Sequence, residues 1–376
     1  MTSSPAVIPL VDLQAAHAEV ASEISSGFER VLAGGAFIKG PDVTAFEREF
    51  AAASGTAYCV GVGSGTDAIE FALRAAGVPE GAGVVLPANT FVATAEAVLR
   101  AGARPVFADV DPDHLLLDPP AAAKAVGQDT AALVPVHLFG QLAPMRELAD
   151  VAAGHDLTII EDAAQSHAAT QCGSPAGTTG LAAAVSFYPG KNLGAYGDAG
   201  AVLTNSAEVD RAVRLLGDHG SEQKYVHAQL GFNSRLDTLQ AVVLRAKLKR
   251  LEEWNVRRRE AAARYDELLS GLDEIALPRT APGNVHAWHL YVVQVPRRDH
   301  VLEVLHGLGI QAGIHYPVPV HLQPAFRRYG YGPGDFPVTE EAAGRILSLP
   351  LYPQITPEQQ AAVADGLRRA LASAAR

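Results

Sequence analysis

Short runs of apolar residues alternate with alanine-rich amphipathic segments between about residues 43 and 240. A short apolar run bounded by glycine or proline is typical of a buried strand, whereas an apolar residue at every third or fourth position is typical of a helix. The alternation of the two patterns predicts a mostly parallel sheet with helices packed on both of its faces.

The pattern on either side of this region predicts a helix at residues 15–32, a long helix at about 240–270, a strand at 288–295 and a short helix at 303–308. A final helix is expected up to Ala374, with Thr356 as its N-cap and Pro357 at its first position. We expect two domains, a large one at residues 1–245 and a smaller C-terminal one at 246–376. The proline- and glycine-rich residues 316–337 are predicted to form a loop over the active site.

The composition allows a large buried core and argues against some classes of partner. Apolar residues make up 48% of the 376 positions and charged residues 19%, so a sizeable core can be buried. A net charge of −11 argues against general nucleic-acid binding. No uninterrupted apolar stretch reaches the roughly 18 residues that a membrane-spanning helix needs, so no membrane span is expected.

The cysteines give an expectation about the cellular compartment. Cys59 and Cys172 are far apart and form no CxxC motif, which predicts reduced, mostly buried thiols. The first residues show no signal-peptide pattern, and together these features favour a cytoplasmic protein. The 13 histidines are scattered, so no metal site is expected.

The dense basic run at residues 245–259 has two interpretations. It alternates with Leu248, Leu251 and Trp254, which predicts an exposed amphipathic helix. A nucleic-acid-binding arm is the less favoured interpretation, because the chain as a whole is acidic.

Lys191 carries the most chemical information in the chain. It lies between a predicted strand end at residues 185–188 and a glycine-rich turn, with no other lysine or arginine within ten positions on either side. A buried lysine on such a loop can lose its proton and attack a carbonyl carbon, because burial disfavours the charged amine. The alternative is an ordinary solvent-exposed lysine.

A second segment places a carboxylate where a cofactor would bind. Residues 157–160 have the character of a buried strand, and Glu161 and Asp162 follow them. Ligands of parallel α/β sheets bind at the carboxyl ends of the strands, where Asp162 could keep a ring nitrogen protonated. Pyridoxal phosphate requires both a lysine and such an acid. The alternative role for Asp162 is that of a helix N-cap, and the two roles are compatible.

A third segment predicts a phosphate site. A short strand at residues 58–62 leads through a glycine- and serine-rich turn into a helix. Backbone N–H groups at a helix start bind phosphate, and Thr66 and Ser186 would add hydroxyl groups. The turn is neither a Walker loop nor a dinucleotide fingerprint, and many strand-to-helix turns have this composition.

These three segments, in this order, resemble the sugar-nucleotide aminotransferases (DegT/StrS type) of the fold-type-I pyridoxal-phosphate superfamily. The resemblance covers nearly the whole chain from about Ile8. Further matching segments are residues 87–94, 106–111, 134–141, 231–241 and 315–321. The resemblance implies a large domain with a mostly parallel seven-stranded sheet and helices on both faces, a smaller C-terminal α/β domain, and pyridoxal 5′-phosphate as cofactor.

The resemblance also implies roles for single residues. Lys191 would form the Schiff base with the cofactor and then move the proton, and Asp162 would pair with the pyridinium nitrogen. Gln165 would lie against the phenolic oxygen, and Phe91 would cover the ring face. The phosphate would be held by Gly65, Thr66 and Ser186, together with Asn233 from the second subunit of a homodimer. Ordinary alternatives are core packing for Phe91, a helix surface for Gln165 and a turn for Asn233.

For the substrates, the resemblance implies L-glutamate as amino donor, a nucleotide-linked keto sugar as acceptor, and ping-pong kinetics. Candidate substrate contacts are Tyr188, His315, Tyr316 and His321, with Lys224 and Arg235 for the nucleotide diphosphate. Residues 225–237 and 254–259 resemble enzymes that aminate C-3 more than those that aminate C-4. We therefore expect a 3-keto-6-deoxyhexose linked to thymidine diphosphate (TDP), in the biosynthesis of amino sugars for natural products such as antibiotics or for surface glycans.

The chain departs from the family pattern at a few positions. Gly190 stands where many relatives carry threonine, Tyr196 lies in a turn that is often aliphatic, and Ala168 follows His167 where glycine is usual. Dehydratase relatives carry histidine in place of the lysine, so Lys191 favours transamination. Amination at C-4, another pyridoxal-phosphate reaction such as that of a lyase, and a regulatory protein without turnover remain as alternatives.

Overall fold

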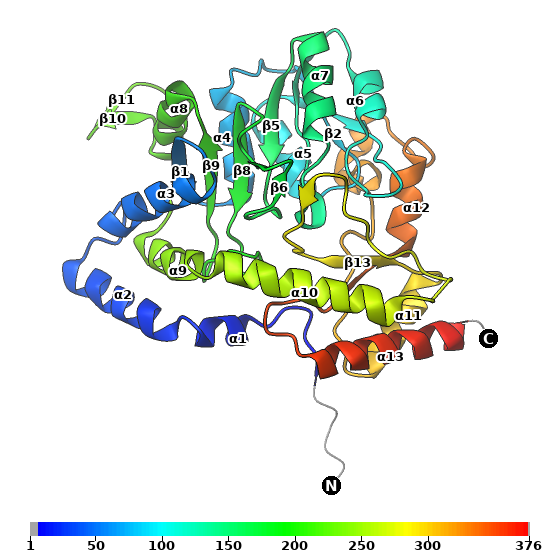
Figure 1. Cartoon of the computed structure of the whole chain (residues 1–376). Coiled ribbons are helices and arrows are strands. Elements are labelled where there is room, and N and C mark those ends of the chain that lie inside the picture. Colours follow the sequence, from blue (N-terminus) through cyan, green and yellow to red (C-terminus); the bar gives the residue numbers. More distant parts are fainter. Residues whose placement is uncertain (1–6, 375–376) are drawn as a thin grey trace.

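The computed structural model describes residues 7–374, and a seven-stranded sheet forms its centre (Figure 1). The strand order is β1 (Tyr58–Val62), β9 (Gly200–Thr204), β8 (Ala182–Ser186), β5 (Thr158–Asp162), β4 (Thr130–Leu133), β2 (Gly83–Pro87) and β3 (Arg104–Ala108). Only β9 runs antiparallel to its neighbours. The predicted mostly parallel sheet is confirmed.

Helices cover both faces of this sheet, which explains why its strands are apolar almost throughout. The covering helices are α3 (Pro41–Ala53), α4 (Gly65–Ala75), α5 (Val92–Arg100), α6 (Pro119–Ala125), α7 (Met145–His155), α8 (Ala207–Gly217) and α9 (Thr238–Leu248). Strands β2 and β9 are buried at every position. The carboxyl ends of β5 and β8 therefore open toward loops and helix starts rather than toward bulk solvent.

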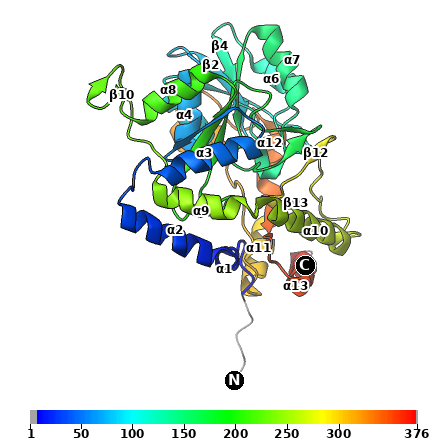
Figure 2. The same cartoon turned by 60° about the vertical axis from the view of Figure 1, so that its left-hand side comes forward.

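Two predicted long helices are each interrupted in the structure. The N-terminal one consists of α1 (Leu13–Ala18) and α2 (Ala21–Gly34), with Val20 in a non-helical conformation between them, and α2 ends where Gly35 takes a left-handed conformation. The second consists of α9 and α10 (Leu251–Leu269), which meet at Arg250. Figure 2 shows α2 and α3 on either side of α9.

A second hydrophobic core lies beside the sheet, between α10, α11 (Arg298–Gly307), α13 (Pro357–Ala374), β13 (Tyr291–Gln294) and β14 (Ile346–Leu349). Thr356 caps α13 as predicted, because its hydroxyl accepts a hydrogen bond from the Gln359 amide (3.2 Å). The division into two domains stays a prediction, and its boundary at residues 245/246 falls inside α9.

The start of the described chain is bound to this second core. The Ile8 amide donates to the Gly309 carbonyl and the Gln311 amide donates to the Ile8 carbonyl, both at 2.9 Å. The Leu351 amide donates to the Leu10 carbonyl at 3.3 Å. Residues 8–10 thus lie against elements that follow the whole sheet in sequence.

Residues 316–337 form a more compact segment than the predicted loop. They contain the 3-10 helices η2 (Val320–Leu322) and η3 (Pro324–Tyr329) and lead into α12 (Pro337–Arg345). Phe326 and Phe336 are buried in the main core of the sheet, where Phe107 contacts both rings. Prolines and glycines set the turns of this segment, whereas its aromatic residues determine where it packs.

Two further expectations are half right. Cys59 is buried as predicted, but Cys172 is exposed. The basic helix has an exposed face, but Arg258 on it is only 4% exposed. Its buried guanidinium donates hydrogen bonds to the backbone carbonyls of Trp288 and Leu351. A buried arginine of this kind holds distant segments together instead of solvating the surface.

The remaining elements are small. They are β6 (Thr170–Gln171), β7 (Ser174–Pro175) and β12 (Asn284–Val285) in one sheet, the hairpin β10 (Ser221–Gln223) and β11 (Val226–His227), and η1 (Leu138–Gly140). Across residues 7–374, none of the helices is long and apolar enough to span a bilayer. The same residues contain no group of three or more side chains arranged to hold a metal ion.

Candidate active site

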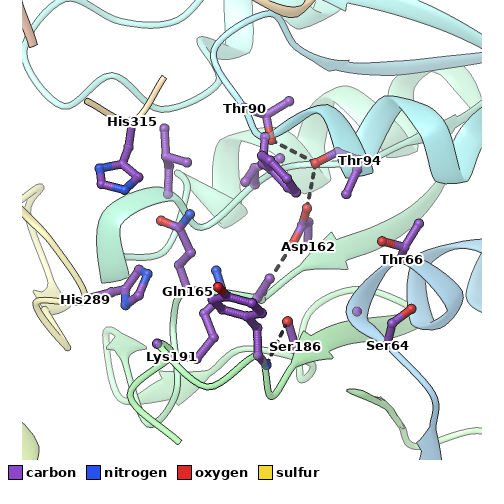
Figure 3. A pocket seen from close by; sticks show the side chains of 18 of the residues that line it. Ser64, Thr66, Thr90, Thr94, Asp162, Gln165, Ser186, Lys191, His289 and His315 are labelled. Carbon is purple, nitrogen blue, oxygen red and sulfur yellow. Dashed lines mark hydrogen bonds between the residues drawn. The ribbon is translucent and has the colours of Figure 1, made fainter. Parts of the chain in front are cut away.

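A cavity of about 500 Å³ lies at the carboxyl ends of β5 and β8, beside the starts of α4 and α5 (Figure 3). Ten of the predicted site residues line it, namely Gly65, Thr66, Phe91, Asp162, Gln165, Ser186, Tyr188, Lys191, His315 and Tyr316. They come from segments spread over some two thirds of the chain, and the fold brings them to one place.

Asp162 is a buried carboxylate at the end of β5, and it is 5% exposed. One oxygen accepts a hydrogen bond from the Thr94 hydroxyl (2.8 Å) and the other from the Ala164 amide (3.1 Å). Burial raises the pKa of Asp162, and the hydrogen bonds from Thr94 and Ala164 offset part of that increase. Among residues 7–374 no salt bridge includes this carboxylate. An isolated buried charge is costly, so this site fits a ligand that brings a cationic nitrogen.

Lys191 lies on the loop after β8, where its amide donates to the Tyr188 carbonyl (2.9 Å). Burial lowers the pKa of the Lys191 amine to about 8, although the nearby Asp162 carboxylate works in the opposite direction. A substantial fraction of the amine is therefore neutral near pH 8, as nucleophilic attack and proton transfer require.

In the cofactor-free protein, we expect Lys191 to react with an amine-selective reagent with a midpoint near pH 8. The amine is charged and unreactive below that pH and neutral above it. Peptide mapping of the modified lysine between about pH 6 and pH 11 measures the midpoint, with the exposed Lys124 on α6 as a reference. A Lys191 midpoint near the ordinary lysine value of about 10.4 would contradict the burial argument.

The start of α4 and the end of β8 form a narrow concave surface. Ser64 caps α4 by accepting from the Asp67 amide (3.1 Å). A Cβ atom on Gly65 would lie 2.6 Å from the Cβ of Ser186, so only glycine allows this approach. The free N–H groups of the helix start thus lie beside two hydroxyl groups, those of Thr66 and Ser186, which suits a phosphate group.

Aromatic side chains form the opposite wall. The rings of Phe91 and Tyr316 lie 5.1 Å apart, and Phe91 is 49% exposed. The Gln165 amide nitrogen donates to the Tyr316 hydroxyl (3.3 Å), while its oxygen accepts from the Phe139 amide (2.7 Å). Burial raises the pKa of Tyr316, so its hydroxyl stays protonated. The two aromatic rings and Lys191 line the same cavity, and aromatic walls suit a flat ring ligand.

Four predicted residues do not line the cavity of this chain. Lys224 lies in the exposed β10–β11 hairpin, Asn233 pairs with the Asp218 backbone, and Arg235 forms a salt bridge with Asp218 (3.0 Å). His321 is buried, and its Nε2 is 3.1 Å from Glu340. Glu340 thus gives His321 a structural partner, and its predicted contact with the substrate stays a prediction. The role of Asn233 in a partner's site stays a prediction.

The sequence interpretation missed several residues that line the cavity. Thr94 supports Asp162 and is itself hydrogen-bonded to Thr90 (2.8 Å), four positions earlier in the chain. His289 and the pair Leu10 and Val11 also line the cavity. The four-residue spacing of the two threonines was the one available signal, because it places both on the same side of a helix start.

Comparison with known proteins agrees with this geometry. The profile of the DegT/DnrJ/EryC1/StrS aminotransferase family matches residues 18–368. The chain belongs to this family. This assignment confirms the family predicted from the sequence and the predicted aminotransferase class.

Two relatives are similar over nearly their whole lengths. The erythromycin biosynthesis sensory transduction protein EryC1 of Saccharopolyspora erythraea is 47% identical, over 93% of this chain and 96% of that protein. The dTDP-3-amino-3,4,6-trideoxy-alpha-D-glucose transaminase of Streptomyces venezuelae is 45% identical, over 96% of this chain and 95% of that protein.

Solved structures share the fold. The crystal structure of DesV of S. venezuelae in complex with a ketimine intermediate has a TM-score of 0.94 and 44% identity, and covers 96% of this chain and 98% of its own. A structure of NtdA from Bacillus subtilis with bound cofactor PMP has a TM-score of 0.88 and 32% identity, and covers 94% of this chain and 82% of its own. The predicted fold class is confirmed, and the predicted cofactor type is confirmed for this family.

Proposed function

We propose that the protein is a pyridoxal-phosphate enzyme that transfers the amino group of L-glutamate to C-3 of a TDP-linked 3-keto-6-deoxyhexose. The observation that carries the proposal is the convergence of Asp162, Lys191 and the start of α4 on one cavity. Similarity to a transaminase named for a dTDP-3-amino sugar supports the choice of C-3 and of the nucleotide.

When bound, pyridoxal phosphate supplies the electron sink that makes a C–H bond beside the amino group acidic. With the cofactor bound, the Asp162 carboxylate would pair with the ring nitrogen and keep a proton on it, and that positive charge would in turn favour the charged form of Asp162. Lys191, in the neutral form that its lowered pKa makes available, would take the proton from the donor carbon and deliver it to a second carbon. The same lysine is therefore both base and acid, and each substrate uses it in turn.

The other residues of the cavity position the reacting groups. The start of α4, Thr66 and Ser186 would hold the phosphate at one end and so fix the position of the ring. The wall of Phe91 and Tyr316 would cover the ring and exclude water, and Gln165, which lines the same cavity, would contact the phenolic oxygen. Tyr188 and His315 then face the remaining space, where a sugar would bind.

We further propose a homodimer in which Asn233 and Lys224 reach the partner's site. The β10–β11 hairpin and the residues after it present large apolar side chains to solvent, with Tyr225 84% and Leu230 95% exposed. Apolar side chains clustered on one protruding segment are typical of an interaction surface. This placement explains how Lys224 and Asn233 could act although they lie outside the cavity of their own chain.

The first test is the visible absorption spectrum of the protein loaded with pyridoxal phosphate. We expect L-glutamate to bleach the visible band, and a TDP-3-keto-6-deoxyhexose, but not its 4-keto isomer, to restore it. Restoration by the 4-keto sugar would overturn the choice of C-3, and failure of glutamate to bleach the band would overturn glutamate as donor.

A regulatory protein without turnover is the second candidate, favoured by the similarity to a protein named for sensory transduction. It predicts a visible band that no amino donor bleaches. The intact arrangement of Lys191 and Asp162 favours the enzyme.

A further inference from the structure

His289 lies in the cavity wall, separated from β13 by Leu290, and the proposed reaction gives it no role. It is 8% exposed, and Figure 3 shows it beside Lys191 and Gln165, on the side of the cavity away from Ser64 and Thr66. A histidine in such a place can donate or accept a proton, depending on its tautomer. The tautomer is fixed by two buried amide side chains.

These two amides, Asn192 and Asn255, form what we call the amide relay. Asn255 Nδ2 lies 2.9 Å from the backbone carbonyl oxygen of His167. A carbonyl oxygen can only accept a hydrogen bond, so this side of Asn255 is its donor and Oδ1 is its acceptor. Asn192 Nδ2 donates to Asn255 Oδ1 (2.9 Å) and to the Ala287 carbonyl (2.8 Å). Asn192 Oδ1 is therefore an acceptor, and it lies 3.2 Å from Nδ1 of His289.

The relay requires that Nδ1 of His289 carries the proton, which leaves a lone pair on Nε2. Within the described part of the chain, no group forms a hydrogen bond with Nε2 of His289. This atom is not fully buried, however, so it is open to the cavity. Burial lowers the pKa of His289 well below its usual value, and the charges of Lys191 and Arg258 and the rings of His315 and His167 add to this effect. The ring is neutral, and it presents an acceptor to the cavity.

The backbone that carries His289 is held firmly in an unusual conformation. Trp288 has φ of 47°, in the left-handed region that a bulky side chain rarely adopts. The Arg258 guanidinium donates to the Trp288 carbonyl (3.1 Å), and a Cβ on Gly140 would come within 2.7 Å of the His289 amide. Strain of this kind persists where the surroundings fix it, and it is concentrated at functional sites.

We propose that Nε2 of His289 accepts an N–H of the Lys191 amine and so directs the lone pair of that amine at the reacting carbon. The inference rests on the proposed function, in which Lys191 must act as a free base. A neutral lysine amine has two N–H bonds and one lone pair, so an acceptor for one N–H restricts where the lone pair points. Asn192 follows Lys191 directly in the chain, so the relay fixes the histidine and the lysine loop to the same buried amides.

The tautomer is tested without any activity measurement, by ¹⁵N NMR of histidine-labelled protein. The His289 signals are assigned by their loss in His289→Gln. We expect the Nδ1–H tautomer in the wild-type protein, with and without cofactor, and no protonation of the ring down to about pH 5. A wild-type His289 with its proton on Nε2, or one that becomes charged near its ordinary pKa of about 6.5, would overturn the proposal.

The positioning role is tested by single-turnover kinetics of the glutamate half-reaction. We expect His289→Phe to slow the rate about 100-fold with little change in glutamate affinity, because a misdirected base is costly even at an unchanged distance. His289→Gln, whose amide oxygen extends to the place of Nε2, should recover part of the rate. The exposed His306 on α11 gives the matched control, and His306→Gln should react as the wild type does.

The outcomes separate this inference from the proposed function. A wild-type protein that does not react with glutamate overturns the function. A wild type that reacts, together with an unaffected His289→Phe, overturns only the role of His289. A variant that is slowed with the sugar substrate but not with glutamate would make His289 a sugar contact, and that result also overturns the positioning of Lys191.

Discussion

Replacing Lys191 with alanine is expected to lower the transamination rate at least about 10⁴-fold, because the same amine serves as attachment point and as proton carrier. No other lysine lines the cavity within the described residues, so no neighbouring amine can take over. Single-turnover measurement with L-glutamate gives the rate, and the visible band of the cofactor-loaded wild type should be absent from Lys191→Ala.

The control for this result is Lys124→Ala, which removes an exposed amine on α6 and should leave rate and spectrum unchanged. Far-ultraviolet circular dichroism should show that both variants are folded. A Lys191→Ala protein that retains more than about a tenth of the wild-type rate would mean that another group moves the proton.

The second large effect is expected for Asp162→Asn, which keeps the shape of the side chain and removes its charge. We expect kcat to fall about 10³-fold, because a neutral amide does not keep a ring nitrogen protonated. Thr94 and Ala164 would then point two donors at a side chain with one acceptor oxygen, so cofactor affinity should fall as well. Steady-state kinetics at saturating cofactor separates the two losses.

Thr94→Val serves as the graded comparison for Asp162. It removes one hydrogen bond to the carboxylate but leaves the charge in place, so its loss in kcat should be about tenfold. Equal losses for Thr94→Val and Asp162→Asn would show that the geometry of Asp162 matters more than its charge.

Much of the fold can be predicted from local sequence patterns, and the predictions that were wrong have a common cause. The buried strands and the sheet class are visible in the sequence because apolar runs and glycines alternate regularly. The breaks at Val20 and Arg250 are not visible, because the helical periodicity continues through each of them. Arg258 suggests an exposed helix face, yet its carbonyl partners at Trp288 and Leu351 are brought to it only by the tertiary fold.

The residues of the candidate site also fall into those that the sequence reveals and those that it does not. Lys191 and Asp162 stand out because each follows a recognisable strand and has a residue type suited to one reaction. Thr94 and His289 were missed because their importance lies in long-range partners, Asp162 for the first and Asn192 for the second. A side chain that acts by fixing another one has no signature of its own in a single sequence.

The attachment of residues 8–10 to the second core affects when the cavity is completed during protein synthesis. Leu10 and Val11 form part of the cavity wall, yet Gly309, Gln311 and Leu351, which hold this segment, are made only after the entire sheet. A nascent chain therefore carries Lys191 and Asp162 in an open cavity until its last elements leave the ribosome. Cofactor captured at that stage would contact only residues made early, such as Asp162, Lys191 and the start of α4, and Leu10 and Val11 would close over it later.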